Sequence, residues 1–370
     1  MWAKMVCIEG RLGQEVSGMK QTGQPRILHV TDGDRKFIPA LMDFFGRHFE
    51  AGSQEFIVMG RDKGRKLEGC QFIHVKRPIA LASFWLMARK FDKIIFHGLL
   101  DFHLVSALRM LPMNFANCYW VVWGGDLDCY NVQADSPRTI FRNQVRKSLV
   151  KRLGHIIAGV DDDVERARDW YGFQGKFHKS IAYLSNTVSP DLEAHPPRKD
   201  TSDGWNVIVG HSGYSINFHS EIFNRLETQI EGRLGKVYCP LSYGNQGYID
   251  QVVEEGKQRF GENFQPLLDF LPLEEYLAIL GKADAVIYAH ESQQALGNTI
   301  ALLGMGKKIY LRKDTGQWDM FTGLGIQLYD CTFLSPEPIS PEAQAENIRI
   351  TKEYFSEKNL AQQYRDIFSS

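Results

Sequence analysis

The sequence predicts an α/β protein with two similar domains, each a parallel sheet that carries helices on both faces. Short apolar strands alternate with amphipathic helices from residue 26 to about residue 330. A stretch rich in proline, charge and small polar residues interrupts this alternation at residues 189–204. The chain of 370 residues is also long for one core, since domains average roughly 150 residues. We therefore expect two Rossmann-like halves joined by a linker.

The first half begins after residues 1–25, which lack periodicity and predict a poorly ordered extension. Apolar and β-branched runs predict strands at 26–30, 55–59, 71–75, 93–96, 118–122 and 155–158. Periodic apolar spacing predicts helices at 43–49, 80–90, 103–110, 137–153 and 161–171. This alternation defines a first domain over residues 26–188.

The pattern restarts after the linker and predicts a second domain over residues 205–340. Its expected strands are 205–209, 236–239, 266–268 and 285–289, and one more strand is expected before residue 325. Its expected helices are 215–230, 246–260 and 273–281. Ser340 and Pro341 then open a last amphipathic helix that runs to about Phe368. We expect this segment, residues 341–370, to be able to pack back on the first domain.

Composition excludes several classes of protein. Hydrophobic residues make up 44% and charged residues 24% of the chain, as in soluble globular proteins. A formal net charge of -1 provides no overall basic field for nucleic acid. The six cysteines form no C-x-x-C pair, which argues against a zinc knuckle or a disulfide framework. No run approaches the roughly 20 apolar residues of a membrane span, so we expect any membrane contact to be peripheral.

Polar loops follow three predicted strands of the second domain. Gly210 and Gly213 would let the backbone approach a pyrophosphate, although the loop does not match the dinucleotide pattern G-x-G-x-x-G. The alternative is a glycine turn that ends where Ser215 caps a helix. Because these loops share one sheet edge, we expect them to bind a nucleotide diphosphate. The residues predicted to bind this donor are Gly210, Ser212, Gly213, Asn217, Tyr243, Gln293, Gln294, Gly297 and Asn298.

Acid/base candidates follow strands of the first domain. Asp126 is our first choice as the base that accepts a proton from an acceptor hydroxyl, followed by His97 and Asp34. The alternatives are that Asp34 caps a turn, that His97 is a hydrogen-bonded core histidine and that Asp126 closes its own loop. Asp126 and Asp128 also spell D-x-D, but this pattern is short and common, so we expect no metal and no cofactor.

The helix expected at 137–153 is basic and carries an apolar stripe. In a chain of almost no net charge, such a helix predicts a local anionic partner, either phospholipid headgroups or a lipid-linked diphosphate. The alternative is the solvated face of a core helix. Its basic residues are Arg138, Arg142, Arg146, Lys147, Lys151 and Arg152.

Several of these patterns occur in order in one known family. They include HV-x-x-x-D at 29–34, FHG at 96–98, W-G-x-D-L at 123–127, VG-x-SG-x-x-x-N-x-H at 209–219, P-x-x-Y at 240–243 and QQ-x-x-G at 293–297. The chain resembles glycosyltransferase family fifty-six, the 4-acetamido-4,6-dideoxygalactose (Fuc4NAc) transferases of enterobacterial common antigen assembly. It departs from the family in the N-terminal stretch, in TDGD and in LSYGNQ.

The resemblance implies a GT-B fold and transfer from a dTDP-sugar to a saccharide on a polyprenyl diphosphate. It also implies a metal-independent enzyme at the cytoplasmic face of the bacterial inner membrane, attached peripherally. Two other functions fit the two-domain pattern: a nucleotide-sugar 2-epimerase, and a non-catalytic sugar-nucleotide-binding protein.

Overall fold

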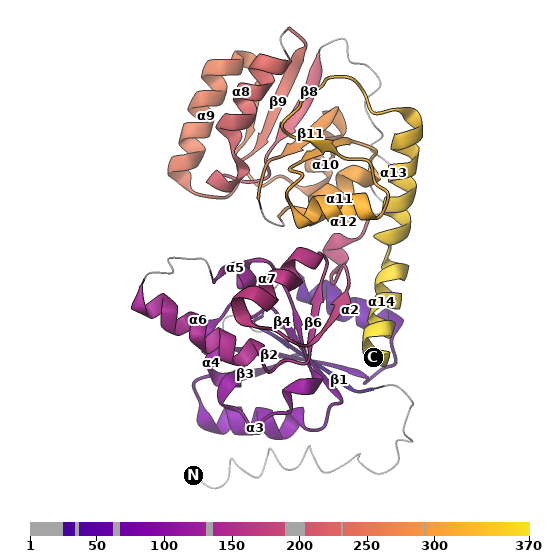
Figure 1. Ribbon diagram of the computed structural model, residues 1–370. Coiled ribbons are helices and arrows are strands. Elements are labelled where there is room, and N and C mark those ends of the chain that lie inside the picture. The colour runs from indigo at the N-terminus through magenta and orange to yellow at the C-terminus, as the bar shows by residue number, and fades with distance from the viewer. Residues whose placement is uncertain are drawn as a thin grey trace.

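The computed structural model describes residues 25–33, 37–61, 67–130, 136–188, 204–230, 232–291 and 294–370. It contains two α/β units, with the first domain below the second in Figure 1. Residues 1–24, almost all of the predicted linker, Asp34 and Gln293 lie outside the described residues.

The described part of the first domain contains a seven-stranded parallel sheet of order β3-β2-β1-β4-β5-β6-β7. The buried strands β1, β4 and β5 explain the continuous apolar runs of the sequence, because helices cover both faces of a parallel sheet. The strands are β1 (Ile27–Thr31), β2 (Gln54–Gly60), β3 (Gln71–His74), β4 (Lys93–His97), β5 (Cys118–Val121), β6 (His155–Ala158) and β7 (Lys176–Lys179). The helices are α2 (Ile38–His48), α3 (Pro78–Ala88), α4 (Phe102–Met110), α5 (Gly125–Asp128), α6 (Pro137–Val150) and α7 (Asp161–Tyr171), with the 3-10 turns η2 (Phe115–Asn117) and η3 (Leu184–Asn186).

The second domain repeats this plan around a six-stranded parallel sheet of order β10-β9-β8-β11-β12-β13 among the residues described. Its strands are β8 (Trp205–Val209), β9 (Leu234–Pro240), β10 (Phe264–Leu267), β11 (Ala285–Tyr288), β12 (Lys308–Leu311) and β13 (Tyr329–Asp330). Its helices are α8 (His219–Gln229), α9 (Gln246–Phe260), α10 (Leu273–Lys282), α11 (Leu296–Gly304) and α12 (Gly316–Gly323), with the turns η5 (Ser215–Asn217) and η6 (Gly261–Asn263).

Each sheet has one point at which the direction of strand addition reverses. β1 pairs with both β2 and β4 in the first sheet, and β8 pairs with both β9 and β11 in the second. The loops that leave the two central strands at such a point diverge, so a crevice opens outside their carboxyl ends. These two points are where the fold favours ligand binding.

The carboxyl edges of the two sheets face each other across the domain contact. Gly316 begins α12 after strand β12, and a Cβ placed there would lie 2.7 Å from Asp162 Cβ, near the start of α7. A Cβ on Gly297 of α11 would lie 2.5 Å from the carbonyl oxygen of Ser185 in η3. Both contacts join segments that follow strand ends, so the loops of the two switch points are on facing sides of the molecule.

The C-terminal segment forms two helices, where the sequence predicted one. α13 (Pro341–Tyr354) lies against α11, and α14 (Glu357–Ser369) is capped by Ser356, whose hydroxyl accepts a hydrogen bond from Asn359 N. The yellow ribbon in Figure 1 runs from the second domain down to the first. There the Tyr364 hydroxyl donates to Ala182 O over 2.8 Å, and Tyr364 packs on Phe45.

Other helix boundaries also differ from the expectations. α2 begins five residues earlier than predicted, because Pro39 suits the first turn of a helix. The helix expected at 215–230 is divided at Phe218, whose φ of 51° ends the turn η5 before α8 begins. β7 and β13 are short strands at the sheet ends that the apolar pattern did not predict.

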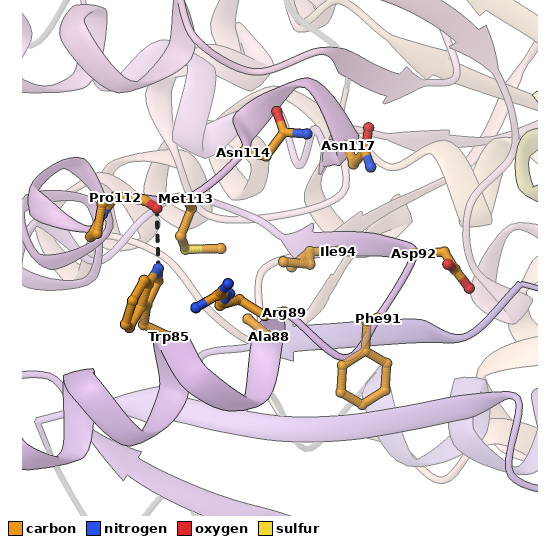
Figure 2. A pocket seen from close by; sticks show the side chains of 10 residues that line it. All are labelled: Trp85, Ala88, Arg89, Phe91, Asp92, Ile94, Pro112, Met113, Asn114 and Asn117. Carbon is orange, nitrogen blue, oxygen red and sulfur yellow. Dashed lines mark hydrogen bonds between the residues drawn. The ribbon is translucent and has the colours of Figure 1, made fainter.

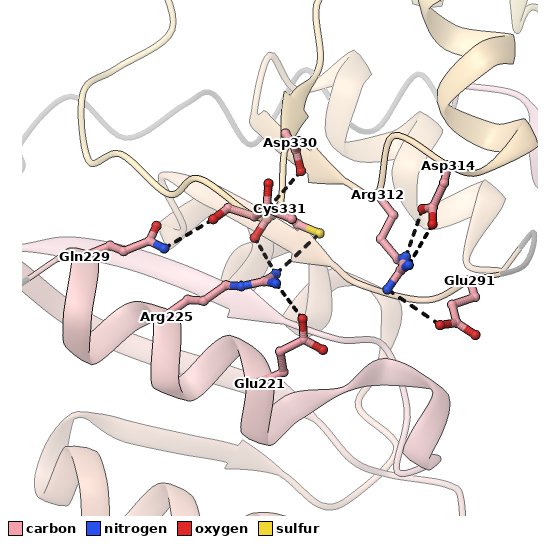
Figure 3. A network of polar contacts seen from close by, with 9 residues as sticks. Glu221, Arg225, Gln229, Glu291, Arg312, Asp314, Asp330 and Cys331 are labelled. Carbon is pink, nitrogen blue, oxygen red and sulfur yellow. Dashed lines mark hydrogen bonds and ion pairs between the residues drawn. The ribbon is translucent and has the colours of Figure 1, made fainter.

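A polar network fastens the last strand of the second sheet to α8 (Figure 3). The Arg225 guanidinium donates to Cys331 O and is paired with Glu221 at 2.5 Å. Beside it, Arg312 follows β12 and is paired with Asp314 at 2.7 Å and Glu291 at 3.6 Å. Arg312 therefore stands at the same sheet edge as the loop after β11.

Candidate active site

The loop after β8 is a tight turn closed by one asparagine. Gly210 has a φ of 67°, and a Cβ there would lie 2.6 Å from His219 Nε2. Asn217 is 1% exposed; its Oδ1 accepts from His211 N, and its Nδ2 donates to the carbonyl and hydroxyl oxygens of Ser212. Asn217 and the buried Ser212 thus fix the shape of the loop. The sequence had instead predicted that both side chains contact the sugar-nucleotide donor directly.

The loop after β9 is joined to this turn through two glycines. Gly213 N donates to Tyr243 O over 2.7 Å, and Asn245 N donates to Gly213 O over 2.9 Å. Gly213 and Gly244 form a parallel bridge so close that a Cβ on Gly244 would lie 2.3 Å from Gly213 O. Tyr243 is 44% exposed and its ring stacks on Phe270. The structure therefore brings Gly210, Gly213 and Tyr243 to one edge, as expected from the sequence.

The loop after β11 meets the β8 loop at the switch point. The rings of His211 and His290 lie 5.5 Å apart in a T-shaped contact, and His290 stacks on Tyr288. His211 also bonds to Gln294, and Tyr288 bonds to Asn298. Of the predicted donor residues in this loop, the structure thus brings Gln294 and Asn298 to the site.

Burial controls the protonation of this cluster. Burial lowers the pKa of His211 to about 4, while hydrogen bonding with the Gln294 and Asn217 side chains opposes the shift. His211 Nδ1 is buried and forms no hydrogen bond within the described residues. A neutral imidazole with a free ring nitrogen at the carboxyl edge is suited to hydrogen bonding with a ligand.

Gly297 has a packing role. Its position in α11 faces η3, so any side chain would collide with Ser185 O. The glycine permits close contact between the two domains beside Gln294. The expectation that Gly297 binds the donor therefore gives way to an indirect role, in which it sets how closely the second domain approaches the first.

Asp126, the first-choice base, is 1% exposed and holds loops together. Its Oδ2 accepts from Leu99 N and Trp120 Nε1 at 2.8 and 2.6 Å, and its Oδ1 accepts from Trp123 N at 2.9 Å. Burial raises the pKa of Asp126, and these bonds oppose the rise. We therefore revise the expected catalytic role: the carboxylate closes its own loop and anchors the segment after β4.

His97 is the centre of a buried chain of hydrogen bonds. Its Nε2 lies 2.9 Å from His29 Nδ1, and its Nδ1 lies 2.7 Å from the Tyr183 hydroxyl. Trp123 Nε1 also donates to that hydroxyl over 2.6 Å. With 1% exposure and both ring nitrogens engaged, His97 positions Tyr183 near the domain contact, and this replaces its expected role as an alternative base.

The basic helix α6 does not present a single basic face. Arg146 is buried, and its guanidinium donates to the carbonyl oxygens of Leu99 and Leu100, so its assignment to a membrane surface was wrong. Arg152 donates to Arg109 O and lies over the Phe115 ring, whereas Lys147 is half-buried and Lys151 is exposed. Arg138 and Arg142, nearer the start of α6, line a pocket at the carboxyl edge of the first sheet.

The D-x-D pair is not arranged as a metal site. Asp126 points inward, and Asp128 pairs with Arg166 at 2.8 Å. Within the residues that the structure describes, no group of three or more His, Cys, Asp or Glu side chains is placed to hold a metal ion. The same residues contain no helix that is long and apolar enough to cross a membrane.

A separate hollow of about 450 Å³ lies at the opposite edge of the first sheet (Figure 2). It is lined by Trp85, Arg89 and Phe91 and by Asp92, which precedes β4. Trp85 Nε1 donates to Pro112 O across one side of it. Because it opens at the amino ends of the strands, it is away from the loops of the switch points.

Three residues at the donor edge were not predicted from the sequence: His211, His290 and Arg312. Arg312 directly follows β12, and His211 and His290 each lie two residues after the last residue of β8 and β11. The missed signal was therefore position: a titratable residue one or two positions after a parallel strand lies at the carboxyl edge of the sheet, where ligands bind in this class of fold.

Known proteins share this architecture. A Rickettsia africae glycosyltransferase superposes with a TM-score of 0.63 at 12% identity, covering 94% of this chain and 98% of that one. Sucrose-phosphate synthase from Thermosynechococcus elongatus superposes with a TM-score of 0.62 at 13% identity. The match covers 93% of this chain and 99% of the synthase. Anabaena HepE, solved with UDP and glucose, superposes with a TM-score of 0.60 at 12% identity. The match covers 93% of this chain and 99% of HepE. These likenesses establish the GT-B fold.

The sequence profile of one family matches residues 40–369, which is most of the chain. That family is described as 4-alpha-L-fucosyltransferase, glycosyl transferase group 56. The chain therefore belongs to glycosyl transferase group 56 and is a glycosyltransferase with the GT-B fold.

Proposed function

We propose that this enzyme transfers a 4-acetamido-4,6-dideoxyhexose of the Fuc4NAc type from a dTDP-sugar to a saccharide carried on a polyprenyl diphosphate. The reaction would serve synthesis of a bacterial surface polysaccharide such as enterobacterial common antigen, at the cytoplasmic face of the inner membrane. Membership of a fucosyltransferase family supports a 6-deoxyhexose as the sugar. Anabaena HepE was solved in complex with UDP, which supports a nucleoside diphosphate as the leaving group.

One observation carries the proposal: the loops after β8, β9 and β11 form a single connected edge at a switch point. The donor diphosphate would lie against the turn at Gly210–Gly213, with the Gln294 amide as a hydrogen-bond donor and His211 beside it. The amino end of the nine-residue helix α11 adds the N–H groups of its first turn and the positive end of its dipole.

The leaving nucleoside diphosphate carries negative charge, so groups fixed at this edge would stabilise the transition state. Arg312 is the cation that follows β12 at the same edge, and we assign it to this role. Asp34, which lies outside the described residues, remains our proposed base, because Asp126 and His97 are engaged within the first domain.

The test is transfer from a panel of dTDP-, UDP- and GDP-sugars to a disaccharide on a short polyprenyl diphosphate, followed by mass spectrometry. We expect product from the dTDP-linked 4-acetamido-4,6-dideoxyhexose and little from the others. Product from GDP-fucose alone would retain a fucosyltransferase but refute the proposed donor. As a control, heat-denatured enzyme should give no product with any donor.

A further inference from the structure

A polar pocket of about 530 Å³ opens at the carboxyl edge of the first sheet, next to the switch point between β1 and β4. It lies away from the donor loops, which belong to the second domain. Its polar lining comes from the ends of β1 and β2, from the start of α4 and from α6. These residues are Asp32, Arg61, Asp101, His103, Arg138 and Arg142.

Positive charge exceeds negative charge in the lining of this pocket, since three arginines stand against the two carboxylates of Asp32 and Asp101. Arg61, Arg138 and Arg142 bring three guanidinium groups to one cavity. Asp101 is held in the fold, because one carboxylate oxygen accepts from His103 N over 2.7 Å and the other lies 3.9 Å from Arg61 Nε. Clustered arginines bind phosphate oxygens through two parallel hydrogen bonds, which suits a diphosphate.

The field of these cations acts on the histidine in the pocket. The pKa of His103 is lowered, first by burial and then by the charge of Arg61, with further contributions from Lys76 and Arg142. Asp101 opposes this shift. A bound anion would reverse the effect of the cations, so the pocket is electrostatically prepared for negative charge.

An apolar rim adjoins the cations. Leu100, Ile140 and Phe141 are 42%, 50% and 62% exposed. The ring of Phe141 lies edge-on to Phe102, 6.3 Å between centroids, and the Arg142 guanidinium lies over the same Phe102 ring at 5.2 Å. Exposed apolar side chains directly beside an anion-binding group are typical of sites for lipids with phosphorylated heads.

Buried side chains fix the backbone of the pocket wall at Leu100 by hydrogen bonds. Asp126 accepts from Leu99 N, and Arg146 donates to the carbonyl oxygens of Leu99 and Leu100. The two buried charges therefore hold the segment between β4 and α4 from both sides. A backbone fixed in this way keeps the pocket in one shape before any ligand arrives, which lowers the entropy cost of binding.

We infer that this pocket binds the diphosphate of an isoprenoid-linked acceptor, with the first isoprene units on the rim formed by Leu100, Ile140 and Phe141. The inference rests on the proposed function, because it assigns a site to the acceptor proposed there. Since the carboxyl edges of the two sheets face each other, the saccharide on this diphosphate starts on the side of the molecule that faces the donor loops.

A direct binding measurement tests the site without catalysis. Isothermal titration of the full chain with geranyl diphosphate should give binding that Arg61→Gln/Arg142→Gln weakens at least about tenfold. Phe141→Ser should weaken the binding of geranyl diphosphate but leave the affinity for inorganic pyrophosphate unchanged. Arg168→Gln, at an exposed arginine of α7, should leave both unchanged. Equal affinity of the double variant and the wild type would overturn the inference.

The same double variant distinguishes an acceptor site from a membrane surface. Vesicles of phosphatidylcholine with and without phosphatidylglycerol are sedimented with each protein. If the double variant loses only binding to anionic vesicles and keeps geranyl diphosphate affinity, the pocket serves phospholipid headgroups and the inference is wrong. Loss of geranyl diphosphate affinity supports it, whatever the vesicle result.

Kinetics separate failure of the inference from failure of the proposed function. The double variant should raise KM at least about tenfold for a disaccharide on a short polyprenyl diphosphate, and leave KM unchanged for the octyl glycoside of that disaccharide. Equal losses with both acceptors would refute the site while transfer itself stands. A wild type that transfers no sugar but binds geranyl diphosphate through Arg61 and Arg142 would refute the function and keep the site.

Discussion

At the scale of single residues, two charged side chains act inside the first domain, although one was expected to be the catalytic base and the other to contact a lipid. Asp126 and Arg146 both bind the segment Leu99–Leu100, one through its amide and the other through its carbonyls. A buried carboxylate with three donors and a buried guanidinium with two carbonyl acceptors satisfy their charges locally. Both side chains would therefore affect activity by fixing the shape of the loop at Leu99–Leu100.

The variant Asp126→Asn distinguishes positioning from base catalysis. The amide group can accept at only one atom, so at least one of the three donors loses its acceptor, at a cost of about 1–3 kcal/mol. We expect a lower melting temperature and a higher KM for the acceptor. A general base would instead show a kcat lowered about a hundredfold with unchanged stability. Calorimetry together with acceptor-dependent kinetics decides between them.

The buried histidines predict a specific dependence of stability on pH. Burial lowers the pKa of His29 to about 4, so the unfolded chain takes up a proton near pH 6.5 and the folded chain does so only near pH 4. The free energy of unfolding should therefore fall as the pH drops from about 6.5 to 4, by about 1.4 kcal/mol per pH unit for each such histidine.

Urea unfolding at several pH values measures this slope. His29→Gln removes one titrating group and should make the slope shallower by about 1.4 kcal/mol per pH unit between pH 6 and 4.5. Phe44→Leu, in the same core, should lower stability without changing the slope. An unaltered slope in His29→Gln would show that His29 titrates alike in both states.

At the scale of elements, the shape of the proposed donor edge depends on how closely two loops approach. Gly213 carries the bridge between the loops after β8 and β9, and Ile249 of α9 occupies the space beside it. The glycine is required for its lack of a side chain, since the Ile249 side chain leaves no room for a Cβ. The sequence showed the glycine, but the neighbour that requires it lies 36 residues away along the chain.

Gly213→Ala tests this contact. The new Cβ would lie 2.2 Å from Ile249 Cγ1, so relief must separate the loops, at a cost of about 1–3 kcal/mol. We expect KM for the donor to rise at least about tenfold and KM for the acceptor to stay constant. Adding Ile249→Ala should recover part of the loss. Gly247→Ala, whose Cβ meets only Asn245 Oδ1 at 3.4 Å, serves as the matched control.

At the scale of the whole molecule, α14 ties the two domains together. It leaves the second domain through α13 and packs its aromatic residues on α2, within a hydrophobic cluster that contains residues of both domains. Tyr364 also bonds to Ala182, a residue with a φ of 63° in the segment that leaves the first domain. The helix thus restrains the segment through which the domains are connected.

Tyr364→Phe should lower the free energy of unfolding by about 1–3 kcal/mol, because the buried Ala182 carbonyl loses its donor. Calorimetry should show the loss as a lower melting temperature. The control is Tyr329→Phe, whose hydroxyl bonds to Gln327 at the surface and should matter little. Equal melting temperatures for wild type and Tyr364→Phe would mean that this hydrogen bond adds little to stability.

Family membership also decides among the functions that fit a two-domain α/β pattern. The match to a glycosyltransferase family over residues 40–369 excludes the epimerase and the non-catalytic binding protein as descriptions of this chain. The sequence motifs by themselves support the same family, because six short patterns occur in order between residues 29 and 297. Each motif alone would have an ordinary structural explanation.

The sequence by itself determined the fold class, the order of nearly all strands and helices and which loops share the carboxyl edge of each sheet, where we propose that the ligands bind. These follow from local periodicity and from the rule that parallel strands end at a common edge. The prediction failed where direction and burial of a side chain mattered, as with Asp126, His97, Arg146 and Gly297.

The tertiary structure alone decided those four roles, because each depends on a partner distant in sequence: Leu99 for Asp126 and Arg146, His29 for His97, and Ser185 for Gly297. It also brought Arg61 beside Arg142, which forms the basic pocket. Helical spacing shows that a residue is charged and on which side of its helix it lies, but only packing decides whether that side faces solvent, a ligand or a backbone carbonyl.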